Sequence, residues 1–381
     1  MVNSELNLGD KSAFVRIMEY FNVEECCEIL DSQRKPVTAK DRTSGQYPYY
    51  GANGIQDYVD KYIFDDDLVL VAEDGGNFGS KTKPIAYRVS GKCWVNNHAH
   101  VLKPKAGLDV DYLCYSLMFY DVGGMVNGAT RQKLTQAAMR QMIIPKRSLD
   151  EQIEIVNIIK KVQGVIASRK KELEQLDLLV KARFVELFGD PETNHKGWNE
   201  CALYERLNVL GGYAFKSDMF DENGGIPVLR IGNINSGYFK PVNMVFWKED
   251  ENLERYVVYP GDLVMSLTGT VGKDDYGNVC ILGDDYDKYY LNQRNAKLEI
   301  KDGIDKFYLS ELLKFEPVKK RLTGISRGVR QANISNKDIL NLIVPVPPLD
   351  VQSRFATFVK QVDKSKFLSN HSLSLIKSIT F

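Results

Sequence analysis

The stretch MIIPKRSLDEQ at residues 142–152 decides the fold, because the chain repeats it as LIVPVPPLDVQ at residues 342–352. Both copies contain three apolar residues, a proline, and then Leu-Asp-x-Gln in the same register. An internal repeat has to be recognised first, since it determines how the rest of the chain is divided. Shorter stretches on its N-terminal side also occur twice.

Four further pairs of segments lie in the same order in the two halves of the chain. DLVL (67–70) resembles DLVM (262–265), VNN (95–97) resembles LNQ (291–293), DYL (111–113) resembles FYL (307–309), and YPY (47–49) corresponds to IPV (226–228). Any one pair is compatible with chance, but five in one order are not. The pattern indicates a tandem duplication of a unit of roughly 190 residues.

Each repeat changes once, from a β-rich first part to a helical second part. Short, mainly apolar runs at 68–72, 228–231 and 263–267 indicate β-strands. From Leu149 to Phe188 the chain has no proline, and its apolar residues recur at spacings of three and four. We predict a helix over this range, ended by Gly189-Asp190-Pro191. A second helix is predicted to follow Leu349.

The apolar residues of both helices form a stripe that is typical of helices packed against a partner. We expect the two helices to pair with each other as an antiparallel coiled coil. A surface helix packed on its own domain is the alternative. The candidate partner-binding residues are Ile159, Ile166, Leu173, Leu176, Val180 and Leu187 in the first helix, and Phe355, Val359 and Val362 in the second.

The predicted fold class is α+β: two β-rich domains alternating with two long helices, related by a pseudo-twofold internal repeat. The expected divisions are a first domain at 1–148, a central helical spacer at 149–189, a second domain at 190–348 and a C-terminal helical spacer at 349–381.

Composition bounds the kind of protein. Of 381 residues, 44% are apolar and 26% are charged, the balance of a chain that buries real cores. No apolar run is long enough to cross a bilayer, and residues 1–16 lack the pattern of a secretory signal, so we expect a cytoplasmic protein without membrane contact. The formal net charge is zero, which argues against a general nucleic-acid scavenger. A DNA-binding protein of this composition has to concentrate its positive charge locally.

Motifs for catalysis or for a bound cofactor are absent from the sequence. There is no Asn-Pro-Pro-aromatic or Asp-Pro-Pro-Tyr motif of an amino-methyltransferase. The Gly-rich stretches at 75–79 and 269–274 match neither a dinucleotide fingerprint nor a P-loop. The six cysteines have no zinc-ligand spacing, and His98-Ala-His100 lacks a third ligand nearby. We predict no catalytic residue, no metal and no cofactor in this chain.

Positive charge is concentrated in one window of each repeat. Between Asp121 and Asp150 the chain has five Lys or Arg and no acidic residue, and between Glu316 and Asp338 it has six and again no acid. Each window carries a glycine just before an Arg-Gln pair, GATRQ at 128–132 and GVRQ at 328–331. Arg bonds a guanine edge with two parallel hydrogen bonds, Gln does so for adenine, and Lys and Arg neutralise phosphates. The recurrence favours a DNA-reading loop over an ordinary basic surface loop.

With these features in place, the chain resembles the specificity subunits of type I restriction–modification systems over nearly its whole length. The second repeat carries the resemblance most clearly, in GYAFKS (212–217), IPVLRIGNI (226–234), PGDLVMS (260–266), GTVGK (269–273), QANIS (331–335) and PVPPLDVQ (345–352). The first repeat departs from it, with YPYYGANG at 47–54 and EDGGN at 73–77 in place of the corresponding segments.

The resemblance implies two target-recognition domains, each reading one half of a split site on double-stranded DNA. It also implies helical spacers that bind two methyltransferase (modification) subunits, with restriction subunits joining that core. S-adenosylmethionine is then expected in the methyltransferase partner and not here. The candidate DNA-binding residues are Asn77, Lys81, His98, Arg131, Gln132, Lys133, Lys216, Arg230, Asn233, Thr268, Thr270, Lys273, Arg294, Arg327, Arg330 and Gln331.

Three other interpretations stay open from the sequence. A specificity subunit of a related defence system, or of a combined cutting and modifying system, has the same features. A duplicated protein–protein scaffold would use the basic loops on acidic partners and show little salt-dependent affinity for DNA. A cryptic nuclease would cut DNA on its own with a metal ion.

Overall fold

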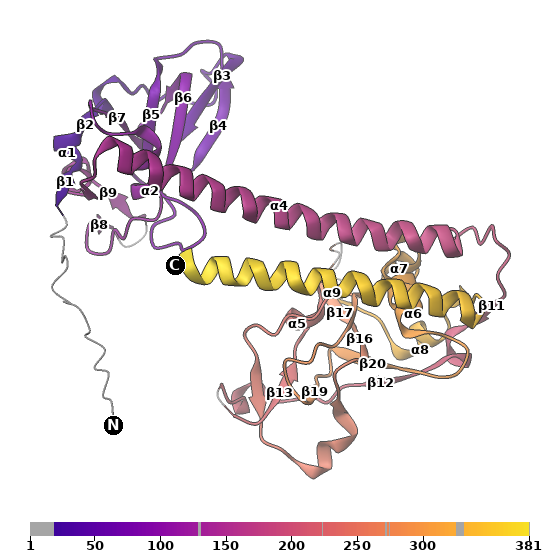
Figure 1. Cartoon of the computed structure of the whole chain (residues 1–381). Helices are drawn as coiled ribbons and strands as arrows, with labels where there is room; N and C mark the ends of the chain where they lie inside the picture. Colours follow the sequence, from indigo (N-terminus) through magenta and orange to yellow (C-terminus); the bar gives the residue numbers. More distant parts are fainter. Residues whose placement is uncertain are drawn as a thin grey trace, which may run out of the picture. The chain divides into compact units, whose positions relative to one another are not determined.

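The computed structural model describes residues 19–128, 131–222, 224–270, 273, 275–324 and 331–380, except for the side chains of 331 and 376–380. The chain divides into two compact units, Met1–Val165 and Ile166–Phe381 (Figure 1). The division falls inside a long helix, because Val156 in its first half packs into the core of unit 1 and Val180 in its second half packs into the core of unit 2.

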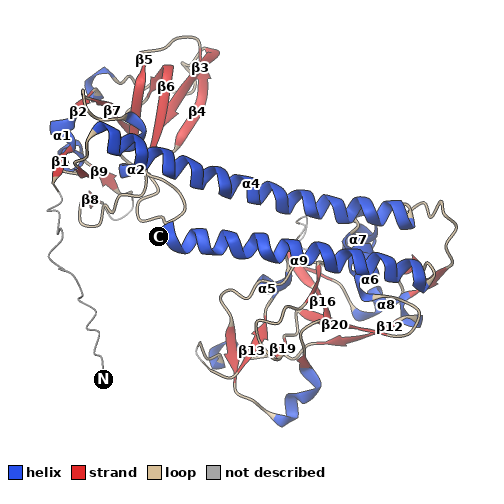
Figure 2. Cartoon of the chain, viewed as in Figure 1, coloured by secondary structure: helices blue, strands red, loops and turns tan. Residues whose placement is uncertain are grey.

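Unit 1 is built on a six-stranded sheet (Figure 2). In spatial order the strands are β2 (Cys27–Ile29), β7 (Ala99–Pro104), β5 (Phe64–Ala72), β6 (Ala86–Val95), β3 (Ser44–Gly51) and β4 (Gly54–Val59). Neighbouring strands are antiparallel, except that β3 and β6 run parallel.

Strand β5 is buried on both faces of this sheet. Leu68 and Leu70 pack into one apolar cluster, whereas Val69 and Val71 pack into a second cluster on the other face. The second cluster also takes in α2 (Val110–Leu117). The end of β5 is therefore held rigidly by two cores.

Unit 2 repeats this topology in two four-stranded sheets. One has the order β12 (Leu207–Gly211), β20 (Asn295–Ile300), β16 (Leu263–Ser266), β18 (Val279–Ile281), and the other the order β14 (Val245–Trp247), β13 (Ile226–Leu229), β19 (Tyr289–Leu291), β15 (Val257–Val258). Strand β13 runs parallel to β19, as β3 runs parallel to β6. The matched segments 47–49 and 226–228 both lie on the strand that makes this parallel pairing.

The stretch that decides the fold has the same structure in both units. In unit 1, β10 (Ile143–Pro145) pairs with β1 (Tyr20–Asn22), and in unit 2, β22 (Ile343–Pro345) pairs with β11 (Glu200–Ala202). The Tyr112 hydroxyl donates to the Pro145 carbonyl at 2.8 Å, and the Tyr308 hydroxyl donates to the Pro345 carbonyl at 2.7 Å.

The glutamine of each copy is buried and forms hydrogen bonds with both ends of its side-chain amide. Gln152 accepts from the Asp109 N–H at 2.8 Å, and Gln352 accepts from the Asp305 N–H at 2.7 Å. Their side-chain amides donate to backbone carbonyls that include those of residues 147 and 347. Both side chains are thus fully satisfied although they are buried, which ties the start of each long helix to the N-terminus of α2 (Val110–Leu117) in unit 1 and of α6 (Lys306–Lys314) in unit 2.

One of the matched pairs is off by a residue. The Ala72 N–H bonds to the carbonyl of residue 85, and the Ser266 N–H bonds to the carbonyl of residue 278, so Ala72 and Ser266 are equivalent. Leu70 therefore corresponds to Val264 and not to Met265. Because side chains alternate along a strand, the shift of one residue changes the face on which every side chain lies.

The two long helices are α4 (Leu149–Phe188), with the predicted bounds, and α9 (Leu349–Thr380). The part of α4 in unit 2 packs antiparallel to α9: the Phe188 and Phe355 rings lie 5.3 Å apart, and farther along Lys366 Nζ lies 2.7 Å from Asp177 Oδ1. The antiparallel pairing is confirmed there. No helix among the described residues is both long and apolar enough to span a bilayer.

Most of the predicted stripe lies in or beside the unit 2 core. Val180, Phe355, Val359 and Val362 are buried there, with Leu176 and Leu187 packed against them. Ile159, Ile166 and Leu173 are half-buried. The stripe did not include Phe184 and Phe188, which are 2% and 3% exposed and whose rings contact each other in the same core.

Short helices complete the two units. They are α1 (Val23–Cys26) and α3 (Gln136–Arg140) in unit 1, and α5 (Ile231–Ile234), α6 (Lys306–Lys314), α7 (Glu316–Thr323) and α8 (Asn336–Leu340) in unit 2, with 3-10 turns at Asp31–Gln33, Leu203–Glu205, Ser217–Met219 and Glu251–Tyr256.

Candidate nucleic-acid interface

The basic segment of unit 1, which is the stretch between Asp121 and Asp150, is the candidate DNA-reading segment and lies against the end of β5. Within it, β9 (Lys133–Leu134) pairs with β8 (Val126–Asn127). The Leu134 N–H donates to the Glu73 carbonyl at 2.7 Å, and the Glu73 N–H donates to the His98 carbonyl at 2.9 Å. The backbone alone therefore brings the residues after β5, the residues before β7 and the basic segment together.

Charged side chains of these three segments pair with one another. Arg131 Nη2 and His98 Nδ1 each lie 2.7 Å from the same oxygen, Oδ1 of Asp74. Lys133 Nζ lies 2.9 Å from Glu73 Oε1. The Arg131 side chain is nevertheless 61% exposed and that of Lys133 51% exposed, so both still face solvent.

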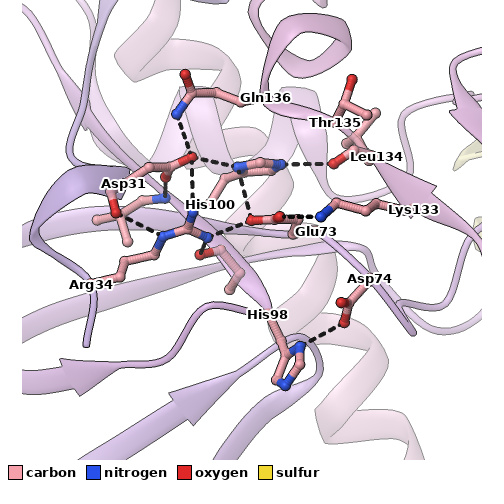
Figure 3. A network of polar contacts seen from close by, with 12 residues as sticks. Asp31, Arg34, Glu73, Asp74, His98, His100, Lys133, Leu134, Thr135 and Gln136 are labelled. Carbon is pink, nitrogen blue, oxygen red and sulfur yellow. Dashed lines mark hydrogen bonds and ion pairs between the residues drawn. The ribbon is translucent and has the colours of Figure 1, made fainter. Parts of the chain in front are cut away.

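A buried polar layer lies beneath these pairs (Figure 3). The ring of His100 is fully buried between Oδ2 of Asp31, 2.6 Å from Nδ1, and the Leu134 carbonyl, 2.9 Å from Nε2. Gln136 donates to the same carboxylate oxygen of Asp31 at 2.8 Å. Arg34 lies 2.6 Å from Glu73 and 3.4 Å from Asp31. The layer thus joins four segments that are distant in the sequence.

The two carboxylates of this layer are held ionised by their partners. Burial by itself raises the pKa of Asp31, but hydrogen bonds from His100 and other donors outweigh burial and hold the pKa below its ordinary value. For Glu73, burial again raises the pKa, and hydrogen bonds from Arg34 and Lys133 lower it to a net value below the ordinary one.

Ligand atoms of Asp31, Glu73 and His100 lie within 4.8 Å of one another, a spacing compatible with a metal ion. Arg34 contacts both carboxylates, however, so the cluster already has its positive partner. His98 faces Asp74 instead and is not part of this group. The sequence stretch His98-Ala-His100 therefore does not form one ligand pair.

Unit 2 builds the same backbone frame. There β17 (Thr268–Thr270) pairs with β21 (Gln331–Asn333). The Ile334 N–H donates to the Leu267 carbonyl at 2.8 Å, and the Leu267 N–H donates to the Arg294 carbonyl at 2.8 Å. These two bonds repeat those made by Leu134, Glu73 and His98 in unit 1.

The side chains on the two frames differ. From the backbone bonds and strand registers, the equivalent pairs are Glu73 and Leu267, Asp74 and Thr268, His98 and Arg294, His100 and Ala296, and Asp31 and Gly211. The carboxylates of unit 1 are thus replaced by uncharged residues, and one histidine is replaced by arginine.

Cationic side chains in unit 2 are correspondingly open. Lys216, Lys273 and Arg294 are exposed, and within the part of the chain that the structure describes no carboxylate forms an ion pair with them. Thr270, also exposed, donates its N–H to Asp275 at 2.8 Å, and this bond lowers the pKa of the Asp275 carboxyl.

Three of the predicted residues of unit 2 line one hollow of about 550 Å³, together with Phe215 and Phe220. Arg230 and Arg294 are the two cationic residues of its lining. Asn233 is only 2% exposed, and its amide bonds the N–H of Arg230 and the carbonyls of residues 240 and 242. The Asn233 side chain therefore helps to shape the hollow, and its hydrogen-bonding groups are already used by the protein's own backbone.

The remaining predicted residues are scattered. Lys81 and Gln132 are exposed, Asn77 is half-buried and donates to the carbonyl of residue 84 at 3.3 Å, and Thr268 is half-buried. Arg327 and Arg330 lie outside the described residues, and Gln331 is described only by its backbone in β21.

Sequence reasoning missed the acidic and buried part of the interface. Asp31, Arg34, Glu73, Asp74 and His100 were not singled out for DNA recognition. A signal exists for two of them, because Glu73-Asp74 directly follows the buried run of β5 and precedes a Gly-Gly pair. Asp31 and His100 are 69 residues apart, and only strand pairing brings them together.

Both halves of the chain match one known family. The family described as type I restriction modification DNA specificity domain matches residues 17–178 and again residues 195–378.

Relatives and solved structures agree with this match. A Haemophilus influenzae protein provisionally named a type I restriction enzyme specificity subunit is 27% identical over 93% of this chain and 89% of its own length. The MjaVIII specificity subunit of Methanocaldococcus jannaschii is 25% identical over 91% and 86%. In fold, the chain is similar to the S subunit of a type I restriction–modification system from M. genitalium, with a TM-score of 0.58, 16% identity and coverage of 95% and 93%.

Proposed function

The chain belongs to the family of type I restriction–modification DNA specificity domains, and on this premise we propose how it reads DNA. Its role is DNA sequence specificity in a type I restriction–modification complex. We propose that unit 1 and unit 2 each bind one half of a split target on double-stranded DNA, through the segments that contain Arg131 and Arg294 respectively.

The observation that carries this proposal is the duplicated frame. In both units a strand buried by two apolar clusters is followed directly by a residue, Glu73 or Leu267, whose carbonyl accepts from the basic segment and whose N–H donates to residue 98 or 294. A rigid base that presents exposed cationic side chains in two copies suits a DNA target with two halves.

The exposed groups match the chemistry of a DNA duplex. Arg131 uses Nη2 for Asp74, which leaves its other guanidinium N–H groups for the O6 and N7 acceptors of a guanine. Lys133 and Lys273 suit phosphate oxygens, since a flexible ammonium carries charge without base information. Arg294 is the candidate base reader of unit 2.

The helices are the proposed docking sites for two methyltransferase subunits, with restriction subunits joining the complex and S-adenosylmethionine held by the methyltransferase. Both helices keep large apolar side chains exposed outside the seam, such as Leu178 at 62%, Phe367 at 69% and Leu368 at 65%. Exposed apolar groups of this size favour a partner surface over solvent.

The decisive experiment is co-expression with the cognate methyltransferase subunit, followed by single-molecule sequencing of the methylated bases. We expect a motif with two specific halves and a constant gap. Arg131→Ala should relax one half and Arg294→Ala the other, by about tenfold in discrimination if each reads one base.

Lys61→Ala is the matched control, because it removes an exposed cation before the start of β5, whereas the frame lies after the end of that strand. A motif without two halves would refute the bipartite proposal. A split motif that neither arginine variant relaxes would keep the bipartite reading and reject these two residues as base readers.

We further propose that α4 sets the gap between the two halves. Inserting seven helical residues after Gly164, N-terminal to the segment that pairs with α9, lengthens the helix by about 10 Å. The gap in the methylated motif should then grow by roughly three base pairs. An unchanged gap would show that α4 is not the ruler.

A further inference from the structure

The basic segment of unit 1 is anchored through Arg131, Lys133, Leu134 and Gln136. Arg131 and Lys133 are tied by their side chains to Asp74 and Glu73. Leu134 is held at both its N–H, by the Glu73 carbonyl, and its carbonyl, by His100. Two residues later, Gln136 donates to Asp31. The His100–Asp31 pair is thus the deepest of these anchors.

Both ring nitrogens of His100 face hydrogen-bond acceptors. Nε2 lies 2.9 Å from the Leu134 carbonyl, and a carbonyl oxygen only accepts, so Nε2 carries a proton. Nδ1 lies 2.6 Å from Asp31 Oδ2 and 3.7 Å from Glu73 Oε2. Which state His100 takes therefore depends on whether Asp31 carries a proton.

The surroundings of Asp31 consist of donors. Its Oδ1 accepts from the Val101 N–H at 2.8 Å, and its Oδ2 accepts from Gln136 Nε2 at 2.8 Å. The amide of Gln136 cannot be turned round without loss, because its oxygen accepts from the guanidinium of Arg140. Arg34 adds a positive charge 3.4 Å from Oδ2. Asp31 is therefore a carboxylate, and the proton lies on His100 Nδ1.

We propose that His100 is held as a doubly protonated imidazolium, and that its two bonds make it the positioning residue for the DNA-reading segment of unit 1. The proposal rests on the proposed function of that segment. Two carboxylates, Asp31 and Glu73, lie among three cationic groups: His100 and Arg34, which are buried with them, and Lys133, whose side chain is half exposed to solvent. Removing one charged side chain from such a buried network is costly, because its partner then stays buried without an opposite charge.

At the equivalent positions that the structure describes in unit 2, this device is missing. Ala296 stands at the position of His100, Gly211 at that of Asp31, and Leu267 at that of Glu73. The two frames thus share their backbone hydrogen bonds. The side chains beneath the frame are charged in unit 1 and uncharged at the equivalent positions in unit 2. A change at His100 should therefore affect the reading of one half of the target only.

The first test is the protonation state of the full chain. With nitrogen-15-labelled histidine, both ring nitrogens of His100 should show the shift and the attached proton of N–H groups at neutral pH. Replacing His98, His195 and His371 by Gln one at a time assigns their signals, so that the fourth belongs to His100 without any change at that residue. One bare ring nitrogen on His100 would overturn the proposal.

The second test is target choice in the complex with methyltransferase. His100→Gln keeps a polar side chain but makes only one of the two bonds, and discrimination at the first half should fall by about tenfold while the second half stays within about twofold. The matched control is Ala296→Gly, which trims the equivalent position in unit 2. Unchanged discrimination at the first half would refute the positioning role.

The outcomes separate this proposal from the function on which it rests. Absence of a split motif with the unaltered chain would refute the proposed function. A split motif that His100→Gln leaves intact would refute only the role of His100. A variant that no longer folds still leaves the protonation measurement on the unaltered chain to decide.

Discussion

The two units present the same hydrogen-bonded frame, but the cationic side chains beside it are paired with carboxylates in only one of them. In unit 1 the cations beside the frame are paired with Glu73 and Asp74, and a charged layer lies beneath them. In unit 2 the corresponding positions are Leu267 and Thr268, and Arg294 stands open to solvent. The comparison teaches that duplication kept the backbone geometry needed to hold a reading segment, while the means of stiffening that segment diverged.

The largest expected effect tests the part that the units share. Gln152→Leu and Gln352→Leu each leave one backbone N–H and two backbone carbonyls without a partner, so each should destabilise its own unit by about 2–3 kcal/mol. Hydrogen exchange followed by mass spectrometry reports the stability of each unit separately. Gln175→Leu, on the exposed side of α4, is the control and should have almost no effect. Unequal losses in the two units would break the claimed equivalence.

Acid should separate the units. The pKa values of Asp31 and Glu73 are lowered in the folded chain, so their contribution to stability is present above their unfolded values and is lost as the pH falls through the folded ones. Below about pH 4, unit 1 should therefore lose stability earlier than unit 2, which has Gly211 and Leu267 at these positions. Hydrogen exchange between pH 5 and 3 measures this order. Earlier loss in unit 2 would contradict the stabilising role of the buried layer.

The smallest effect exchanges one charge between the frames. Asp74→Asn frees Arg131 and His98 from a carboxylate and should make binding to DNA of the first half-site stronger and more salt-dependent, with the slope of log K against log salt steeper by up to about 0.9. Thr268→Asp should do the reverse for the second half-site. Salt titrations of the complex on DNA that varies in one half only measure both slopes. Parallel slopes for all variants would show that Asp74 does not tune the charge of the interface.

The predicted elements agree with the structure where the pattern of neighbouring residues is enough to specify them. The bounds Leu149 and Phe188 follow from apolar spacing, the absence of proline and the terminating Gly189-Asp190-Pro191, all of which act within a few residues. The duplication could be recognised in the sequence because Gln152 and Gln352 are buried and hydrogen-bonded to the backbone, so that few other residue types could replace them. The match of DLVL to DLVM failed by one residue, since only strand register decides which face a side chain takes.

The candidate site was predictable only in its exposed half. The basic residues Arg131 and Lys133 form a visible cluster of charge in the sequence, and both lie on the frame. The position of Asp74 just after the buried run of β5 is a weaker signal, and His100 gave none, because a single histidine on a strand is unremarkable in a sequence. Their roles follow from the partners that β5 and β7 bring to them.

By itself, the sequence determined that this protein is a duplicated α+β chain with two long helices and two local concentrations of positive charge. Periodicity, repeats and charge runs are properties of neighbouring residues, and they need no knowledge of the fold. Only the tertiary structure decided that one frame is stiffened by the ions of Asp31, His100 and Glu73 and the other by apolar packing. The physical reason is that a buried charge is tolerable only beside its partner, and the partners here are brought together across many residues by strand pairing.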